Sequence, residues 1–176
     1  MRREPPPLDP MRSSLVVVDM QNDFIDGSLG TREAAGIVAG VVDKVRRARA
    51  EGREVVFTRD THGADYSASR EGRYLPVPHC RQGTPGWELH PDLAPFADKI
   101  FDKPGFGSTG LVEYIRAGGY GRVEFVGLCT DICVVTNALM VKGALPELDV
   151  AVDAACCAGV RVAPVESTWL SREPSR

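Results

Sequence analysis

The chain has 176 residues, of which 43% are hydrophobic and 26% are charged, and its formal net charge is −3. This length and composition suit one globular domain with a substantial core. The scattered basic residues form no stripe for a nucleic-acid backbone, and the apolar runs are far shorter than the roughly 20 residues that cross a bilayer. We therefore expect a protein that binds neither nucleic acid nor a membrane.

The N-terminus and the cysteines give an expectation for the cellular compartment. Residues 1–12 are charged and proline-rich and lack the apolar core of a signal peptide, so they are predicted as a flexible tail before a domain of residues 13–176. The five cysteines are an odd number without framework spacing. In a reducing compartment they would be free thiols, and we expect a cytoplasmic protein.

Apolar and amphipathic segments alternate along the first half of the domain. Residues 14–18 form a continuous apolar run, typical of a strand covered on both faces. Residues 31–51 are predicted as an amphipathic helix, and residues 54–58 as a second strand. Residues 63–95 are irregular, and a loop of this length inside a compact domain is usually functional.

The second half continues this alternation. Strands are predicted over residues 99–101, 122–128 and 148–153. One helix is predicted over residues 109–117, and another follows the strand that ends at residue 128 and runs to about residue 142. The βαβ pattern predicts an α/β fold, a single-domain, Rossmann-like three-layer α/β/α sandwich with a mostly parallel sheet. Residues 160–176 show little helical periodicity and are expected to be short or irregular.

Three reactive side chains stand where apolar runs end. Asp19 follows residues 15–18, Lys103 follows residues 100–101, and Cys133 lies just beyond the run that ends at Leu128. Open α/β sheets place their chemistry at the carboxyl ends of the strands, so we expect these side chains to converge. A carboxylate, an ammonium and a thiol supply a base, a cation and a nucleophile, which predicts a cysteine hydrolase.

Cys133 lies at the predicted junction of a strand and a helix, with Thr130 or Asp131 as the expected N-cap. Backbone N–H groups and the helix dipole would favour the thiolate there and could hold an oxyanion. Three alternatives stay open: Cys133 as a buried structural cysteine, Asp19 as a turn residue and Lys103 as an exposed lysine. Spacing alone does not decide between a Cys–His pair and a Cys–Asp–Lys set.

A candidate metal site follows the second predicted strand. Asp60 and His62 alternate in an extended segment, so both side chains can reach one ion, and Glu71 and His79 stand further along the loop. This mixture of ligands suits Zn²⁺, with Fe²⁺ or Mn²⁺ as alternatives. A hydrogen-bonded Asp–His turn pair beside a solvated glutamate is equally open. Since a thiol is already available as nucleophile, a metal here would orient a ligand rather than generate hydroxide.

Five motifs, in order between residues 14 and 159, resemble those of the nicotinamidase/isochorismatase family of cysteine hydrolases. They are DMQNDF at 19–24, DTH at 60–62, PHC at 78–80 with GTPG at 83–86, Lys103, and GLCTDICVVTNA at 127–138. One such motif would be weak evidence, whereas five in sequence are specific for the family. The resemblance implies the isochorismatase-like hydrolase fold.

The same resemblance implies roles for the converging residues. Asp19 would be the general base, Lys103 would support the thiolate and the transition state, and Cys133 would attack an amide carbonyl. Water would then hydrolyse the acyl-enzyme. The resemblance also implies a cis peptide at Leu128–Cys129, with the N–H groups of Cys129 and Cys133 as the oxyanion hole.

The resemblance further implies a metal and a substrate pocket. Asp60, His62 and His79 would be metal ligands, and Glu71 is the natural fourth candidate because this chain has Tyr66, Ser67 and Ala68 where some members use a third histidine. The ion would hold the pyridine nitrogen of nicotinamide. The implied substrate-binding residues are Phe24 and Phe106, which would flank the ring, and Gln21.

The leading prediction is hydrolysis of nicotinamide to nicotinate and ammonia, a step in NAD recycling. A second amidase activity, on a carbamoyl or ureido substrate, and a non-catalytic ligand-binding member are the alternatives. Asn137 departs from the small residue that the family often has there, and no amphipathic final helix is predicted. The second departure leaves open whether the chain forms a homo-oligomer.

Overall fold

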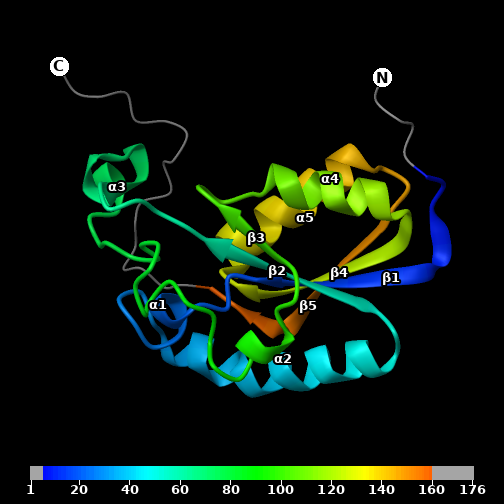
Figure 1. The fold of residues 1–176 in the computed structure, drawn as a ribbon, viewed down its shortest axis with the longest axis horizontal. Coiled ribbons are helices and arrows are strands. Elements are labelled where there is room, and N and C mark those ends of the chain that lie inside the picture. Colours follow the sequence, from blue (N-terminus) through cyan, green and yellow to red (C-terminus); the bar gives the residue numbers. More distant parts are fainter. Residues whose placement is uncertain (1–5, 160–176) are drawn as a thin grey trace.

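The computed structural model of the chain describes residues 6–159, which form a five-stranded sheet between two layers of helices (Figure 1). The strands lie in the order β3-β2-β1-β4-β5, and every neighbouring pair is parallel. Their bounds are β1 (Asp9–Val18), β2 (Glu54–Asp60), β3 (Ile100–Lys103), β4 (Tyr120–Leu128) and β5 (Asp149–Ala158). The predicted three-layer α/β/α fold with a parallel sheet is confirmed.

The helices connect these strands across both faces of the sheet. The α-helices are α1 (Asn22–Ile25), α2 (Arg32–Ala50), α3 (Arg70–Tyr74), α4 (Thr109–Gly118) and α5 (Val135–Ala144). The 3₁₀ turns η1 (Tyr66–Ala68) and η2 (Ala94–Phe96) and the π-helical turn η3 (Thr130–Val134) complete the described elements. Figure 1 shows α2 on one face of the sheet and α4 and α5 on the other, with α1 and α3 beyond one edge. Of the helices in this part of the chain, none has both the length and the apolar character that crossing a bilayer requires.

The apolar run of β1 is buried on both faces of the sheet. Leu15 and Val17 belong to the core on the α2 side, while Val16 and Val18 belong to the core on the α4 and α5 side. All four side chains are fully buried. Successive strand residues point to opposite faces, so a strand between two helical layers requires apolar residues at every position.

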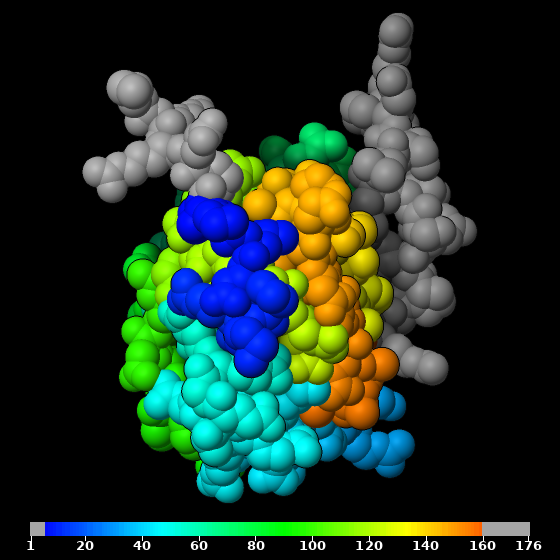
Figure 2. Space-filling model, turned by 90° about the vertical axis from the view of Figure 1, so that its right-hand side faces the viewer, coloured from blue at the N-terminus to red at the C-terminus, as the bar shows by residue number. Residues whose placement is uncertain are grey.

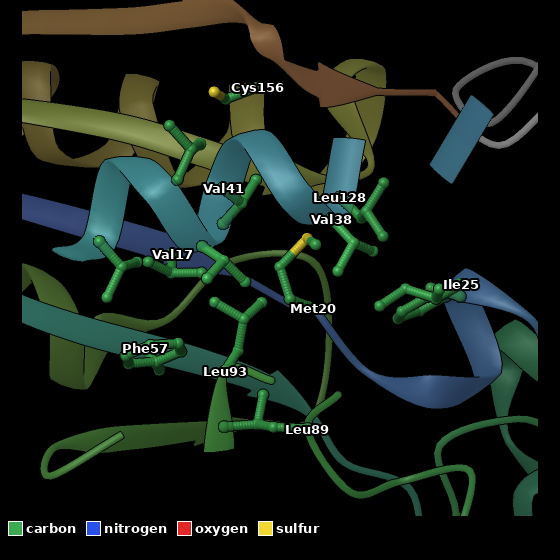
Figure 3. Close-up of a cluster of buried hydrophobic side chains, with 14 of the residues drawn as sticks. Val17, Met20, Ile25, Val38, Val41, Phe57, Leu89, Leu93, Leu128 and Cys156 are labelled. Carbon is green, nitrogen blue, oxygen red and sulfur yellow. The ribbon is translucent and has the colours of Figure 1, made fainter. Parts of the chain in front are cut away.

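Helix α2 closes one core because its apolar residues share one face. Thr31 caps the helix by accepting a hydrogen bond from Ala34 N at 3.0 Å. Figure 3 shows Val41 of α2 beside Val17 of the sheet, and Val38 of α2 beside Leu128 and Met20. Burying side chains of this size contributes about 1.5–3 kcal/mol each, which fixes the helix against the strands.

Two strands, β1 and β5, extend furthest beyond their predicted bounds. β1 begins at Asp9, within the segment expected to be tail, because Asp9 N donates to Gly119 O at 2.8 Å and Arg12 lies over the ring of Tyr120 at 4.9 Å. Figure 2 shows this start of β1 on the molecular surface. β5 continues past its predicted end at residue 153 to Ala158. The start of β1 is exposed and mostly polar, and the end of β5 consists only of alanines and cysteines, so neither extension shows the bulky apolar run that marks a strand. The irregular ending expected for residues 160–176 lies outside the described residues.

Candidate active site and metal centre

Four segments meet at the carboxyl-terminal edge of the sheet. Asp19 directly follows β1, Asp60 ends β2 and Lys103 ends β3, with Asp60 and Lys103 paired in the strand register. Cys133 lies in η3, just after β4. Because β3, β2, β1 and β4 are neighbours in the sheet, their ends bring these four side chains together.

Lys103 is the centre of this group. Its Nζ lies 2.7 Å from Asp19 Oδ2, 3.3 Å from Asp60 Oδ1 and 3.3 Å from Cys133 Sγ, and it donates to Gly105 O at 3.1 Å. The residue is only 1% exposed. Burial would lower the pKa of Lys103, but the carboxylates of Asp19 and Asp60 raise it well above its usual value. The ammonium is therefore charged, and the structure brings the three predicted reactive groups together.

Asp19 is held by the neighbouring strand. Its carboxylate accepts a hydrogen bond from Thr58 Oγ1 at 2.7 Å, and its N–H donates to Thr58 O at 3.2 Å. The backbone of Asp19 has φ of 47°, in the left-handed region that a non-glycine residue rarely adopts. Burial raises the pKa of Asp19, and the adjacent Lys103 ammonium opposes that rise. A carboxylate of raised pKa in contact with an ammonium is suited to accept and return a proton.

Cys133 lies in the first helical turn after β4, as predicted, but the helix start differs from the expectation. Cys129, rather than Thr130 or Asp131, occupies the N-cap position, and no side chain caps the turn. Its carbonyl accepts hydrogen bonds from the N–H groups of both Ile132 and Val134, each at 3.1 Å. The Cys129 carbonyl thus stabilises this turn. The sequence prediction looked for a capping side chain and therefore placed the N-cap one or two residues too late. The Leu128–Cys129 peptide is cis, as the resemblance implies.

The Cys133 side chain is buried, with 4% of the residue exposed. Burial raises the pKa of the Cys133 thiol well above its usual value, the charge of Asp19 raises it further, and Lys103 opposes both effects. The structure therefore favours the thiol in the resting site, contrary to the expectation that the helix start favours the thiolate. Because burial and the Asp19 charge oppose ionisation of this thiol, Cys133 would need a base to act as the predicted nucleophile.

The predicted metal ligands face one another beside this group. His62 Nε2 lies 2.9 Å from Asp60 Oδ2, and His79 Nε2 lies 3.5 Å from the same oxygen. Glu71 Oε1 lies 3.9 Å from His62 Nε2 and 3.6 Å from His79 Nε2. The ligand atoms of Asp60, His62 and His79 all lie within 4.8 Å of one another. Asp60 belongs both to this cluster and to the group around Lys103, because its Oδ2 faces the two histidines while its Oδ1 contacts Lys103 Nζ.

These side chains fit a divalent cation. His79 Nδ1 donates to Val77 O at 2.8 Å, so Nε2, which faces the cluster, is the ring nitrogen that a metal ion would bind in place of a proton. His62 Nε2 is buried and has no hydrogen bond of acceptable geometry among the described residues. Burial alone would lower the pKa of His79, but Asp60 and Glu71 raise it to about 9. Two carboxylates that draw a proton onto a buried imidazole are also suited to draw a metal ion.

Tyr66 is a neighbour of this cluster that the sequence reasoning did not assign. Its ring lies edge-on to the rings of His62 and His79, at centroid distances of 4.8 and 5.0 Å. The Tyr66 hydroxyl donates to Leu75 O at 2.8 Å, away from the imidazoles. Tyr66 therefore supplies an apolar wall that fixes both rings. The sequence signal was its place where some family members use a third histidine.

Two buried amides brace the site. Gln21 Nε2 donates to Asp60 O at 2.9 Å and to Trp87 O at 2.8 Å, while its Oε1 accepts from Asp60 N at 2.7 Å. The structure thus gives Gln21 a different task from the substrate contact that the resemblance implies, because its amide is engaged by main chain. Asn137 Nδ2 donates to Cys133 O at 2.8 Å and to Phe106 O at 3.0 Å.

The two predicted aromatic residues lie on different sides of the site. The Phe24 ring, from α1, is buried and its centroid lies 5.5 Å from that of His79. Phe106 is half-buried and packs against the core cluster that contains Cys133. One aromatic side chain is therefore beside the predicted metal ligands and the other beside the core cluster that contains Cys133.

A family model described as Isochorismatase domain matches residues 13–171. The chain belongs to the isochorismatase family. Its similarity to a nicotinamidase/pyrazinamidase from Mycobacterium tuberculosis is 33% identity over 138 residues, which covers 69% of this chain and 74% of that relative.

Solved structures of the isochorismatase family share the fold. A pyrazinamidase of Pyrococcus horikoshii in complex with zinc superimposes with a TM-score of 0.74 at 31% identity, over 86% of this chain and 88% of that one. An N-carbamoylsarcosine amidase from Thermoplasma acidophilum gives a TM-score of 0.73 at 31% identity, over 87% of each chain. These relatives identify the chain as a family amidohydrolase, but their named substrates differ.

Proposed function

We propose that this protein is a cysteine amidohydrolase that converts nicotinamide to nicotinate and ammonia through a thioester acyl-enzyme. The observation that carries the proposal is the position of one buried ammonium. Lys103 Nζ contacts both Asp19 Oδ2 and Cys133 Sγ, at 2.7 and 3.3 Å. Base, cation and nucleophile are thus within reach of one reacting carbonyl.

In the acylation half of this reaction, Asp19 removes the proton from the Cys133 thiol. The sulfur forms a bond to the amide carbonyl carbon, and the carbonyl electron pair moves onto oxygen. Collapse of this tetrahedral species breaks the C–N bond, and Asp19 returns its proton to the departing nitrogen, which leaves as ammonia. Lys103 stays charged throughout and stabilises the negative charge on sulfur.

In the deacylation half, Asp19 takes a proton from water while the water oxygen attacks the thioester carbon. The C–S bond then breaks, the proton returns to sulfur, and the product leaves as the carboxylic acid, which releases its proton to solvent to become nicotinate. We assign the N–H groups of Cys129 and Cys133 to the oxyanion in both halves, because N–H groups in a first helical turn lack intrahelical acceptors. One carboxylate therefore acts as base and acid in turn.

The ligands of the proposed metal are Asp60, His62, His79 and Glu71, with Zn²⁺ as the first candidate and Fe²⁺ or Mn²⁺ as alternatives. When bound, the ion supplies a Lewis acid for a lone pair of the substrate, such as a pyridine nitrogen. Phe24, beside His79, and Phe106, beside the nucleophile's cluster, would then flank the ring. The similarity to a pyrazinamidase solved with zinc supports this assignment.

A carbamoyl amide is the second candidate substrate. The N-carbamoylsarcosine amidase favours this candidate, because its TM-score of 0.73 and its 31% identity to this chain nearly equal those of the pyrazinamidase. The same thiol, base and ammonium would hydrolyse either amide.

A substrate panel tests the choice. Zinc-loaded protein is assayed for ammonia release from nicotinamide, pyrazinamide, N-carbamoylsarcosine and a ureido acid. We expect kcat/KM for nicotinamide and pyrazinamide, the two amides with an aromatic ring nitrogen, to exceed that for the other two compounds by at least about 100-fold. A ring nitrogen that binds the metal adds affinity that the other compounds lack. A higher value for a carbamoyl compound would establish the second candidate, and no turnover of any amide would contradict both.

The metal assignment has its own test. His62→Ala should lower the zinc content of the purified protein and raise KM for nicotinamide. His90→Ala is the matched control, because His90 lies outside the ligand cluster. Stoichiometric, tightly held zinc in the His62 variant would show that the ion binds elsewhere.

We place this activity in the cytoplasm, in the recycling of nicotinamide for NAD. All five cysteines fall within residues 6–159 and are free there, which suits a reducing compartment. A reactive thiol is also the cysteine most readily oxidised, so a reducing compartment would preserve it.

A further inference from the structure

The carboxylate of Asp23 is enclosed by main chain rather than by charged side chains. Its Oδ2 accepts a hydrogen bond from Cys80 N at 2.7 Å, and its Oδ1 accepts from Ser28 N at 3.3 Å. Among residues 6–159, no ion pair involves Asp23. Hydrogen bonds to an ionised acceptor are roughly twice as strong as neutral ones, so the bond to Cys80 N is a firm anchor.

The loop that carries His79 is folded directly onto this carboxylate. Asp23 N donates to Gly86 O at 2.9 Å, and a Cβ added to Gly86 would lie only 2.2 Å from Asp23 Oδ2. Glycine is therefore required at position 86 for the loop to close around Asp23. Figure 1 shows the loop that follows α3 passing beside α1, the helix that carries Asp23.

Cys80, the residue that Asp23 anchors, connects the two histidines of the metal centre. It directly follows His79, and its carbonyl accepts a hydrogen bond from His62 N at 2.9 Å. Its φ is 44°, in the left-handed region that is unfavourable for a side chain, so this conformation needs an external restraint. The Asp23 carboxylate on the Cys80 N–H provides that restraint.

We propose that Asp23 is a positioning residue of the metal centre: by binding the Cys80 N–H it holds His79 and His62 in the relative placement that the ion requires. This inference rests on the metal site proposed above. Asp23 touches neither the ligand atoms nor the reacting groups, and acts through one peptide of the loop.

Zinc affinity in three variants tests the inference. Asp23→Ala removes the acceptor, Asp23→Asn keeps an acceptor oxygen without the charge, and Asp26→Ala is the control because Asp26 is an exposed residue at the end of the same helix. By competition with a chelator, we expect Asp23→Ala to bind zinc about 10- to 100-fold more weakly than the unmodified protein. Asp23→Asn should recover part of this loss, and Asp26→Ala should match the unmodified protein. Excess zinc should restore kcat in Asp23→Ala, which a general loss of structure would not allow.

A second measurement makes the inference independent of the metal. In zinc-free protein, hydrogen exchange should become at least tenfold faster across residues 78–86 in Asp23→Ala, while the amides of β1 keep their protection. Unmodified protein that binds no zinc would contradict the proposed metal site, and the exchange result alone would then decide the role of Asp23 in fixing the loop. Unchanged exchange across residues 78–86 in Asp23→Ala would overturn the inference in either case, as would unchanged affinity in a protein that does bind zinc.

Discussion

At the scale of single residues, the site depends on compensation among buried charges. Asp19, Asp60 and Lys103 are each at most 4% exposed, and two carboxylates share one ammonium. Ionised groups lose several kcal/mol of hydration on burial, and their mutual attraction repays that loss only while every partner is present. Lys103 is therefore as important for the fold of the site as for its chemistry.

Replacement of Lys103 tests this compensation. Lys103→Met should abolish amidase activity and lower the free energy of unfolding by about 3–5 kcal/mol, because two buried carboxylates lose their cation. Urea unfolding near neutral pH measures the change. Lys99→Met, at an exposed lysine just before β3, is the control and should have little effect. A Lys103→Met protein as stable as the control would show that the carboxylates are not held by this ammonium.

The sequence predicted that Asp19, Lys103 and Cys133 converge, but it did not predict which residues hold them in place. Asp19, Lys103 and Cys133 each follow an apolar strand, and strand ends in a parallel sheet meet at one edge. The main-chain contacts of Gln21 and the ring contacts of Tyr66 depend on how residues 60–89 fold back over the sheet. No local periodicity encodes that path.

At the scale of elements, Asn137 joins the nucleophile's turn to the loop after β3. Its amide donates to Cys133 O and Phe106 O, and its Oδ1 accepts from Ser108 N at 2.9 Å. Ser108 in turn caps α4, by accepting from Leu111 N at 3.1 Å. Asn137, where this chain departs from the family pattern, is thus a buried residue whose amide oxygen and nitrogen both form hydrogen bonds.

Removal of this amide should loosen the junction. Asn137→Ala leaves two carbonyls and one N–H without their partner, so we expect a loss of about 2 kcal/mol in the free energy of unfolding and a lower kcat. Both quantities can be measured by urea unfolding and ammonia release. Leu139→Ala, at a position 66% exposed on the same helix, is the control. Equal stability of the two variants would contradict the bridging role.

The elements themselves followed largely from periodicity. The capped helix after Thr31 and the helix that ends at Gly119, with φ of 62°, both lie where the sequence predicts them. The short helix α1 and the turns within residues 63–95 were not predicted, because segments of three to five residues carry no helical repeat. Hydrogen bonds to the rest of the molecule determine them.

At the scale of the whole molecule, a charged cluster ties α2 to the sheet far from the candidate site. Lys44 of α2 and Arg53 bind the two oxygens of Glu124 in β4, at 2.7 and 2.9 Å, and Lys44 also pairs with Asp153 in β5. Burial would raise the pKa of Glu124, but hydrogen bonds from Lys44 and Arg53 lower it from 4.5. A carboxyl whose pKa is lower in the folded state stabilises the fold above its unfolded pKa, and this contribution is lost as pH falls through the folded pKa.

The pH dependence of stability tests this cluster. Glu124→Gln should cost about 1 kcal/mol near neutral pH, and the difference from the unmodified protein should shrink as pH falls below about 4. Urea unfolding at a series of pH values gives both results. Glu113→Gln, at a glutamate whose side chain is 67% exposed, should change neither. A Glu124 variant whose deficit stays constant down to acidic pH would contradict the lowered pKa.

The central claim is that Cys133 carries the acyl group, with Asp19 and Lys103 as its partners. Zinc-loaded protein turning over nicotinamide can be quenched in acid and its peptides weighed by mass spectrometry. The account predicts a hydroxylamine-sensitive nicotinoyl thioester on the peptide that contains Cys133, and its loss together with ammonia release in Cys133→Ala. Undiminished ammonia release by Cys133→Ala, or an acyl group on one of the other four cysteines, would contradict it.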